Sequence, residues 1–307
     1  MMTIVKWFRT LGAGLYITAL SMLMRIRRTF ETPDLKSVGA HPRLHVYGTF
    51  NLWRHYCNVS WCEARRLRSF EIFALIIYHV RLIDDYVDEQ LRPQGIPVDS
   101  KSLKAGSRQL VQLIRRKIAE LPVTDEIKRE LVRTFQDYRR RVAAAFVVEG
   151  HAGHDAPLEA VLQQRWDITA LVYITIIRTL NLIHGIDPTT TRNIEDIFAN
   201  WSITLQVSDD ILDFDADVDS IQNIVVSIAR KHPDEMSRWL SRKRVTLRWA
   251  RHHAPSILQD VNQVWQHYAD KMLTIAPDHP VVRVMIIISA VIKRAVLSHF
   301  PGNLYKL

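Results

Sequence analysis

The chain has 307 residues, of which 48% are hydrophobic, and it carries a net charge of +9. Its two cysteines, Cys57 and Cys62, are too few for a disulfide-stapled scaffold and have no zinc-type partners nearby, so we expect a reducing compartment. The positive charge is spread over short basic runs without a nucleic-acid recognition motif. Nucleic acid is therefore a poor candidate partner, whereas anionic lipid or an anionic substrate stays open.

The first 30 residues form a segment of their own. Residues 10–24 are uncharged and mostly apolar, with basic residues on both sides. This stretch is shorter than the roughly 20 residues that a membrane-spanning helix needs, and no small-residue cleavage site follows it. We expect residues 1–30 to form an uncleaved helix at a membrane surface, on a cytoplasmic protein that is peripheral to the membrane. The alternative is an ordinary first helix of the bundle.

Helix signals dominate residues 31–307, which we predict to be one all-α domain. Breaks rich in Pro and Gly separate the segments, and no linker or internal repeat interrupts them. We expect an antiparallel helical bundle with a central apolar cavity. The segments with helical spacing of apolar residues are 66–90, 103–120, 125–149, 157–184, 193–217, 234–250, 255–273 and 280–298.

Two clusters of aspartates lie on these segments. Asp84, Asp85 and Asp88 follow a stretch, 70–83, that is apolar nearly all round. The second cluster includes Asp209, Asp213 and Asp217, and it follows an apolar stretch over 197–207. Carboxylates at i and i+4 share one face of a helix, about 6 Å apart along its axis. The sequence thus predicts two acidic rows on apolar helices.

Like charges at this spacing repel each other and destabilise a helix. Mg²⁺ would relieve that repulsion, because it prefers carboxylate oxygens and is commonly shared between protein carboxylates and substrate phosphates. Two facing rows would form a clamp for a diphosphate bridged by Mg²⁺. The alternative is that these acids simply coat a solvated helix face.

The motifs resemble those of the squalene and phytoene synthases. In that family an arginine precedes a first Asp-x-x-x-Asp pair, as Arg81 precedes Asp84 and Asp88 here. A glutamine stands seven residues before the second pair, as Gln206 stands before Asp213. The segment around Phe50 and the basic run 65–68 also fall where the family's substrate-entry segment lies.

The resemblance implies a class I isoprenoid-synthase fold and an allylic prenyl diphosphate of C15 or C20 as substrate. It also implies a cluster of Mg²⁺ ions, expected to be three with diphosphate bound. By position, the catalytic metal ligands would be Asp84, Asp88, Asp213 and Asp217. Asp85 and Asp209 are further candidate ligands, and Arg81 and Gln206 would contact diphosphate.

Other side chains could complete such a site. Arg165 and Arg178, on the predicted helix 157–184, could neutralise diphosphate, or they could be surface residues with packed stems. Aromatic rings could exclude water and stabilise an allylic cation, although plain core packing is equally open. The candidate wall residues are Phe73, Tyr78, Tyr173, Phe198 and Trp201.

The chain departs from the family at positions that affect the product. Asp209 and Leu212 stand where the family has asparagine and arginine, and residues 172–180 lack its Val-Ala-Gly-x-Val-Gly stretch. We therefore expect a straighter middle helix. Both clusters also match the Asp-Asp-x-x-Asp motif of chain-elongating trans-prenyltransferases, without the glycine-lysine that follows the second.

The sequence thus leaves three candidate functions. The first is prenyl transfer of the squalene/phytoene-synthase type. The second is a terpene cyclase that uses one prenyl diphosphate on the same scaffold. The third is an inactive helical protein that only binds prenyl diphosphate.

Overall fold

The structure, a computed structural model, describes residues 44–87, 91, 99–151, 156–218, 223–241, 245 and 247–298, and these residues form helices without strands. The expected membrane-associating segment 1–30 lies outside this part of the chain. The helices are α3 (Leu44–Tyr56), α4 (Trp61–Arg66), α5 (Ser69–Tyr86), α6 (Ser100–Ala119), α7 (Asp125–His151), α8 (Leu158–Arg165), the π-helix η2 (Trp166–Ala170), α9 (Leu171–His184), α10 (Pro188–Leu212), α11 (Phe214–Asp217), α12 (Ile224–Ala229), α13 (Pro233–Leu240), α14 (Leu247–His253), α15 (Pro255–Ile275) and α16 (Pro280–Ser298).

Most of the predicted helices are confirmed, with two corrections. The predicted helix 234–250 is two helices, because α13 ends at Leu240 and α14 begins at Leu247. The predicted helix 193–217 begins earlier, at Pro188, and ends at Leu212. The sequence reading also missed α3, α4 and α12, of which the last two have only six residues each.

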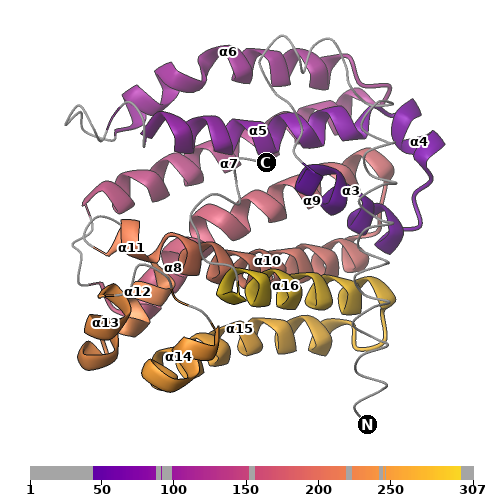
Figure 1. The fold of residues 1–307 in the computed structure, drawn as a ribbon. Coiled ribbons are helices and arrows are strands. Elements are labelled where there is room, and N and C mark those ends of the chain that lie inside the picture. Colours follow the sequence, from indigo (N-terminus) through magenta and orange to yellow (C-terminus); the bar gives the residue numbers. More distant parts are fainter. Residues whose placement is uncertain are drawn as a thin grey trace.

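The helix α10 is the centre of the bundle. It packs against α9 and η2 on one side and against α15 and α16 on the other. Figure 1 shows the same order in space, with α6 and α5 above, α7 and α9 in the middle, and α16 and α15 below α10. The short helices α11 to α14 gather at the left end of the bundle in this view.

Local chemistry defines where α10 begins. Gly185 ends α9 in the left-handed conformation, with φ of 63°, which a glycine adopts without steric cost. Asp187 then caps α10, because its carboxylate accepts hydrogen bonds from the backbone N–H groups of Thr189 and Thr190. Pro188 fits the first helical position, where a backbone N–H is not needed. This turn directs α10 back through the core.

The middle helix 157–184 is not a single regular α-helix. Residues Trp166–Ala170 form a π-helical segment between α8 and α9, in which the N–H of Leu171 bonds to the carbonyl of Trp166. Such π segments interrupt the regular ladder and often occur at functional sites. Whether this helix is straighter than that of the squalene and phytoene synthases stays a prediction. Within the described residues, Leu158–His184 is also the one helix long and apolar enough to cross a membrane, but most of it is buried in the bundle.

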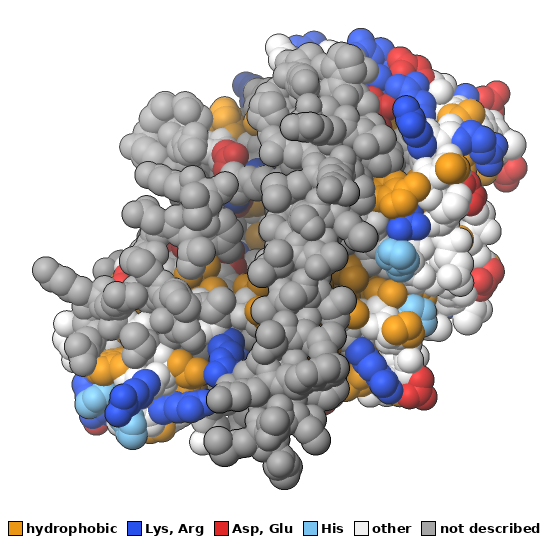
Figure 2. All heavy atoms as spheres, turned by 45° about the vertical axis from the view of Figure 1, so that its right-hand side comes forward, with side chains coloured by type: hydrophobic (Ala, Val, Ile, Leu, Met, Phe, Trp, Pro, Cys, Tyr) orange, Lys and Arg blue, Asp and Glu red, His pale blue; other side chains and the backbone are white. Residues whose placement is uncertain are grey.

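Two short basic runs, 65–68 and 115–117, supply ion pairs inside the fold. Lys117, which is buried, lies 3.1 Å from Glu71, and Arg68 lies 2.9 Å from the same carboxylate. Both cations also approach Glu120, so the cluster joins α5 to the end of α6. In Figure 2, Lys and Arg at the upper right are interspersed with Asp and Glu. The ion pairs of Lys117 and Arg68 therefore serve the packing of α5 against α6.

Candidate metal and diphosphate site

The first acidic motif lies on the last turns of α5. Arg81 forms an ion pair with Asp84 at 3.3 Å and with Asp85 at 2.9 Å. All three side chains are partly exposed, so solvent or a ligand can reach them. Asp88, the partner of Asp84 in the predicted pair, lies outside the described residues. The structure thus places one cation and two carboxylates of the motif together at the end of a buried helix.

The second motif crosses a break between two helices. Asp213 has a non-helical backbone, with φ of −92° and ψ of 7°, and separates α10 from α11. The backbone ladder continues across it, because the N–H of Asp213 bonds to the carbonyl of Asp209 and that of Asp217 to the carbonyl of Asp213. The three carboxylates therefore keep their spacing of one turn. Their surroundings differ, since Asp213 is exposed and Asp217 is buried.

The carboxylates of the second row repel one another. Partial desolvation, and then repulsion from Asp209, Asp217 and Asp210, raises the pKa of Asp213 to about 7, while Arg165 acts in the opposite direction. A carboxyl with this pKa is partly desolvated and lies close to other carboxylates. A divalent cation among the oxygens would relieve this repulsion, and such a donor set is the kind that Mg²⁺ prefers.

Asp210 is turned away from the row and into the core. One of its oxygens accepts a 2.7 Å hydrogen bond from the N–H of Ile224, and the other accepts a 2.6 Å bond from the amide of Gln206. The guanidinium of Arg165 lies 3.7 Å from it. Burial raises its pKa to about 6, and these partners act against that shift. Asp210 thus holds the end of α10 to α8 and α12.

Two predicted diphosphate contacts lie beside the second motif. Arg165 is largely buried next to Asp210. Gln206 bonds to Asp210, and its side-chain oxygen accepts a 3.1 Å hydrogen bond from Thr169 in η2. Whether either residue contacts a diphosphate stays a prediction.

Arg178 is placed elsewhere. Its guanidinium forms two hydrogen bonds, of 2.9 and 2.6 Å, with the carboxylate of Glu195. Glu195 precedes Asp209 by roughly 20 Å along α10, at about 1.5 Å per residue. Arg178 is thus paired with Glu195 far from the second row, and its contact with diphosphate stays a prediction.

The two motifs lie at the same end of the bundle. Both α5 and α10 run from right to left in Figure 1, and α9 packs against both of them. Residues 84–85 and 209–213 therefore end on one side of the molecule. Among the described residues, however, no three His, Cys, Asp or Glu side chains lie close enough together to form a metal site.

Most of the predicted wall residues are packed in the core. Phe73 and Phe198 are fully buried, and Trp201 donates its ring N–H to the carbonyl of Met285. Tyr173 meets Trp201 edge-on at 6.0 Å between ring centroids, and Tyr78 is partly buried against the same cluster. Phe50, expected near the substrate entry, is likewise buried among aromatic rings. In this structure these rings act as core.

Ser69, His184 and Glu63 form another polar cluster, arranged like the nucleophile, base and acid of a catalytic triad. The ring of His184 lies 2.9 Å from the hydroxyl of Ser69 and 3.3 Å from the carboxylate of Glu63. Ser69 is fully buried and donates its hydroxyl proton to the carbonyl of Ala64, and the His184 side chain is also buried. A substrate cannot reach this hydroxyl. The cluster instead ties α4, α5 and α9 together.

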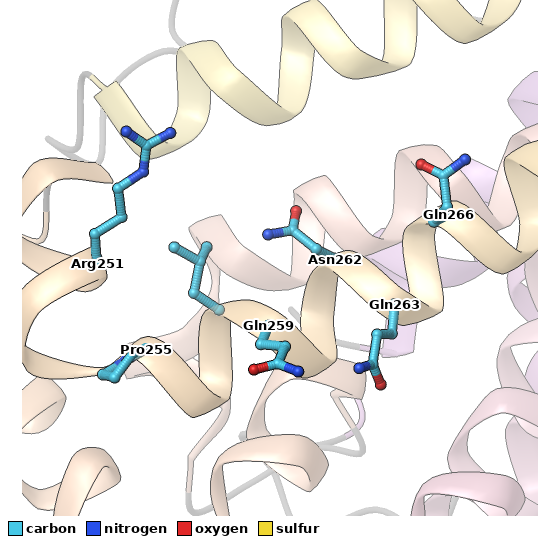
Figure 3. A pocket seen from close by; sticks show the side chains of 7 residues that line it. Arg251, Pro255, Gln259, Asn262, Gln263 and Gln266 are labelled. Atoms are coloured by element: carbon cyan, nitrogen blue, oxygen red, sulfur yellow. The ribbon is translucent and has the colours of Figure 1, made fainter.

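A hollow of about 520 Å³ lies along α14 and α15. It is lined by the side chains of Arg251, Pro255, Leu258, Gln259, Asn262, Gln263 and Gln266. Figure 3 shows that Gln263 points away from Asn262 and Gln266, so the polar groups do not converge. The hollow includes no residue of either acidic motif.

Solved structures with a similar fold are prenyl diphosphate synthases. A decaprenyl diphosphate synthase from Rhodobacter capsulatus superposes with a TM-score of 0.56 at 16% identity, covering 91% of this chain and 96% of that chain. A geranylgeranyl pyrophosphate synthase from Lactobacillus brevis gives a TM-score of 0.47 at 16% identity, covering 94% and 98%. No protein-family model and no curated protein sequence matches the chain.

The first of these matches establishes the fold. The chain is a single all-helical bundle of the isoprenoid-synthase type, as expected from the sequence. The structural likeness is to trans-prenyl diphosphate synthases and not specifically to squalene or phytoene synthases. At 16% identity the match carries no information on the substrate.

The sequence reading missed Asn223 near the second motif. Its side chain caps α12 and donates to both the backbone of Asp210 and the carboxylate of Asp217. An asparagine directly before the apolar run Ile224–Ala229 is a usual helix-start signal, and it could have been found.

Proposed function

We propose that the chain is a Mg²⁺-dependent class I isoprenoid synthase, which ionises an allylic prenyl diphosphate and transfers the prenyl group in the manner of squalene and phytoene synthases. The observation that supports this most is the position of the two acidic motifs. They end α5 and α10 on the same side of an isoprenoid-synthase fold. Carboxylates at two helix ends on one side of the fold would hold a diphosphate through metal ions.

The residues proposed to bind this ion are carboxylates, the donors that Mg²⁺ prefers. The ligands would be Asp84, Asp85, Asp88, Asp209, Asp213 and Asp217, of which Asp88 lies outside the described residues. When bound, Mg²⁺ would neutralise charge on the departing diphosphate. Arg81 would add a cation beside the first row, and Arg165 would hold the second row through Asp210.

A terpene cyclase on the same scaffold is the second candidate. It is favoured by Leu212, which stands at the position of a family arginine and packs against the core cluster around α12 and α15. Without that cation, the site has less charge with which to hold a second diphosphate. A site for one substrate molecule would fit such a residue.

Product analysis separates these functions. Purified protein would be incubated with Mg²⁺ and geranyl, farnesyl or geranylgeranyl diphosphate, and the hydrocarbons identified by mass spectrometry. A product with twice the carbons of the substrate supports coupling, and one with the same number supports the cyclase. Tight binding of the substrate without any product would leave the inactive binding protein.

For the N-terminal segment, we propose peripheral attachment to a membrane through residues 1–30. Basic residues flank its apolar stretch on both sides, which suits anionic headgroups. An apolar prenyl product would leave the enzyme directly into such a surface.

A further inference from the structure

Asn223 uses the full hydrogen-bonding capacity of its side chain. Its oxygen accepts bonds of 2.8 and 3.0 Å from the backbone N–H groups of Val225 and Val226. Its nitrogen donates bonds of 2.8 Å to the carbonyl of Asp210 and 3.0 Å to a carboxylate oxygen of Asp217. The residue is only 1% exposed, so water cannot replace these partners.

These bonds join the parts of the chain that lie on either side of the break at Asp213. Asp210 lies before the break, and Asp217 lies after it at the end of the four-residue helix α11. Asp210 reinforces the joint, because its carboxylate accepts the N–H of Ile224 directly beside Asn223. The amide of Asn223 and the carboxylate of Asp210 thus hold the start of α12 against the chain on both sides of the break.

We infer that Asn223 is a positioning residue, which orients the Asp217 carboxylate for Mg²⁺; this inference rests on the proposed function. The amide holds the Oδ2 atom of Asp217 and so fixes the orientation of the carboxylate. A neutral donor suits this role, because it fixes the carboxylate without replacing the cation. Partners that orient ligating carboxylates typically contribute about 10- to 100-fold to metal affinity.

Substitutions that keep the helix cap separate positioning from folding. Asn223→Ser retains an oxygen that can cap α12 but removes the donor to Asp217. Asn223→Asp also retains the cap and places an acceptor oxygen opposite the Asp217 carboxylate. If Asn223→Ser folds poorly, the same Mg²⁺ titration is made with Asn223→Asp. Asn200→Ser is the matched control, since Asn200 is a buried asparagine of α10 that bonds to the carbonyl of Asp196.

The experiment is calorimetric titration of the full chain with Mg²⁺ in the presence of inorganic diphosphate. Asn223→Ser should raise the half-saturating Mg²⁺ concentration by about 10- to 100-fold, with an unchanged helical circular dichroism spectrum. Asn200→Ser should leave it within about twofold of wild type. In an Asp217→Asn background, Asn223→Ser should have no further effect, because its target carboxylate is gone.

The outcomes distinguish this inference from the function on which it rests. If wild type binds Mg²⁺ and Asp213→Asn abolishes the binding, but folded Asn223→Ser binds as wild type does, the positioning role is wrong and the metal site stands. If wild type itself binds no Mg²⁺ with diphosphate present, the proposed function fails and the positioning role fails with it.

Discussion

Arg178 and Glu195 form a two-contact ion pair between α9 and α10, with nitrogen to oxygen distances of 2.9 and 2.6 Å. Glu195 is buried, whereas about half of the Arg178 side chain is exposed. The pair satisfies an acid that would otherwise be costly to bury. Its geometry gives Arg178 a structural role in the packing of the two helices.

Arg178→Met should therefore lower the free energy of unfolding by about 1–2 kcal/mol, measured by urea denaturation. The expected KM for a prenyl diphosphate is unchanged. The double variant Arg178→Met/Glu195→Met should recover part of the stability, because it no longer leaves a buried acid unpaired. If Arg178→Met is as stable as wild type but has a strongly raised KM for the prenyl diphosphate, Arg178 contacts the diphosphate.

Asp213→Asn should stabilise the metal-free protein at pH 8. The pKa of Asp213 is raised from 3.8 to about 7 in the folded state, so ionised Asp213 opposes folding above that pH. As pH falls through 7 the folded protein binds the proton, and the advantage of asparagine should vanish toward pH 4. Thermal melts in EDTA at pH 8 and pH 5 would test this.

The matched control for that experiment is Asp270→Asn, on the exposed face of α15. It changes the net charge by the same amount outside the second row. With Mg²⁺ and diphosphate added, wild type should gain more stability than Asp213→Asn. Equal gains would mean that Asp213 does not bind the metal.

His79 should make the fold sensitive to acid. Burial, and then repulsion from Arg139, lowers its pKa from 6.5 to about 3, so the folded state keeps the ring neutral between the hydroxyl of Tyr138 and the ring of Phe135. The unfolded state binds a proton below pH 6.5. Stability from this source is complete above that pH and falls by up to about 1.4 kcal/mol per pH unit toward pH 3.

The comparison is wild type against His79→Leu, by urea denaturation from pH 8 to pH 4. Asp210 and Asp213 shift stability in the opposite direction, so the difference between the two proteins is the informative quantity. It should be constant above pH 7 and move in favour of the variant below about 6.5. A difference independent of pH would contradict a neutral buried His79.

Deletion of residues 1–28 should abolish binding to vesicles that contain anionic lipid. In the full chain, binding should weaken as salt is raised, because basic residues near the surface supply part of it. Sedimentation with vesicles would measure both effects. Unchanged sedimentation of the truncated protein would mean that another surface meets the membrane.

The sequence predicted the fold and the acidic motifs because both are local patterns. The apolar circumference of 70–83 indicated a buried helix, and the spacing of Asp84 and Asp85 after Arg81 put them at its end. The partners of Arg178 and Asp217 could not be read in this way. Glu195 and Asn223 reach them through the packing of α9 on α10 and of α12 on α11, which no short-range spacing encodes.

The helix break at Asp213 could not be predicted from the spacing of apolar residues either. The apolar pattern continues through Phe214, which is buried, so 193–217 has the pattern of one helix. The buried bonds of Asp210 and Asn223 hold the chain on both sides of Asp213, and repulsion within the row disfavours a regular helix there. Tertiary contacts thus decide where α10 ends.

The most direct measurement is release of diphosphate from farnesyl or geranylgeranyl diphosphate by the full chain. Release should require Mg²⁺, stop in EDTA, return when Mg²⁺ is restored, and be abolished in Asp84→Ala and Asp213→Ala, both with near-native circular dichroism. Unimpaired release by either folded variant, or release in EDTA, would contradict a metal clamp built from the two acidic motifs.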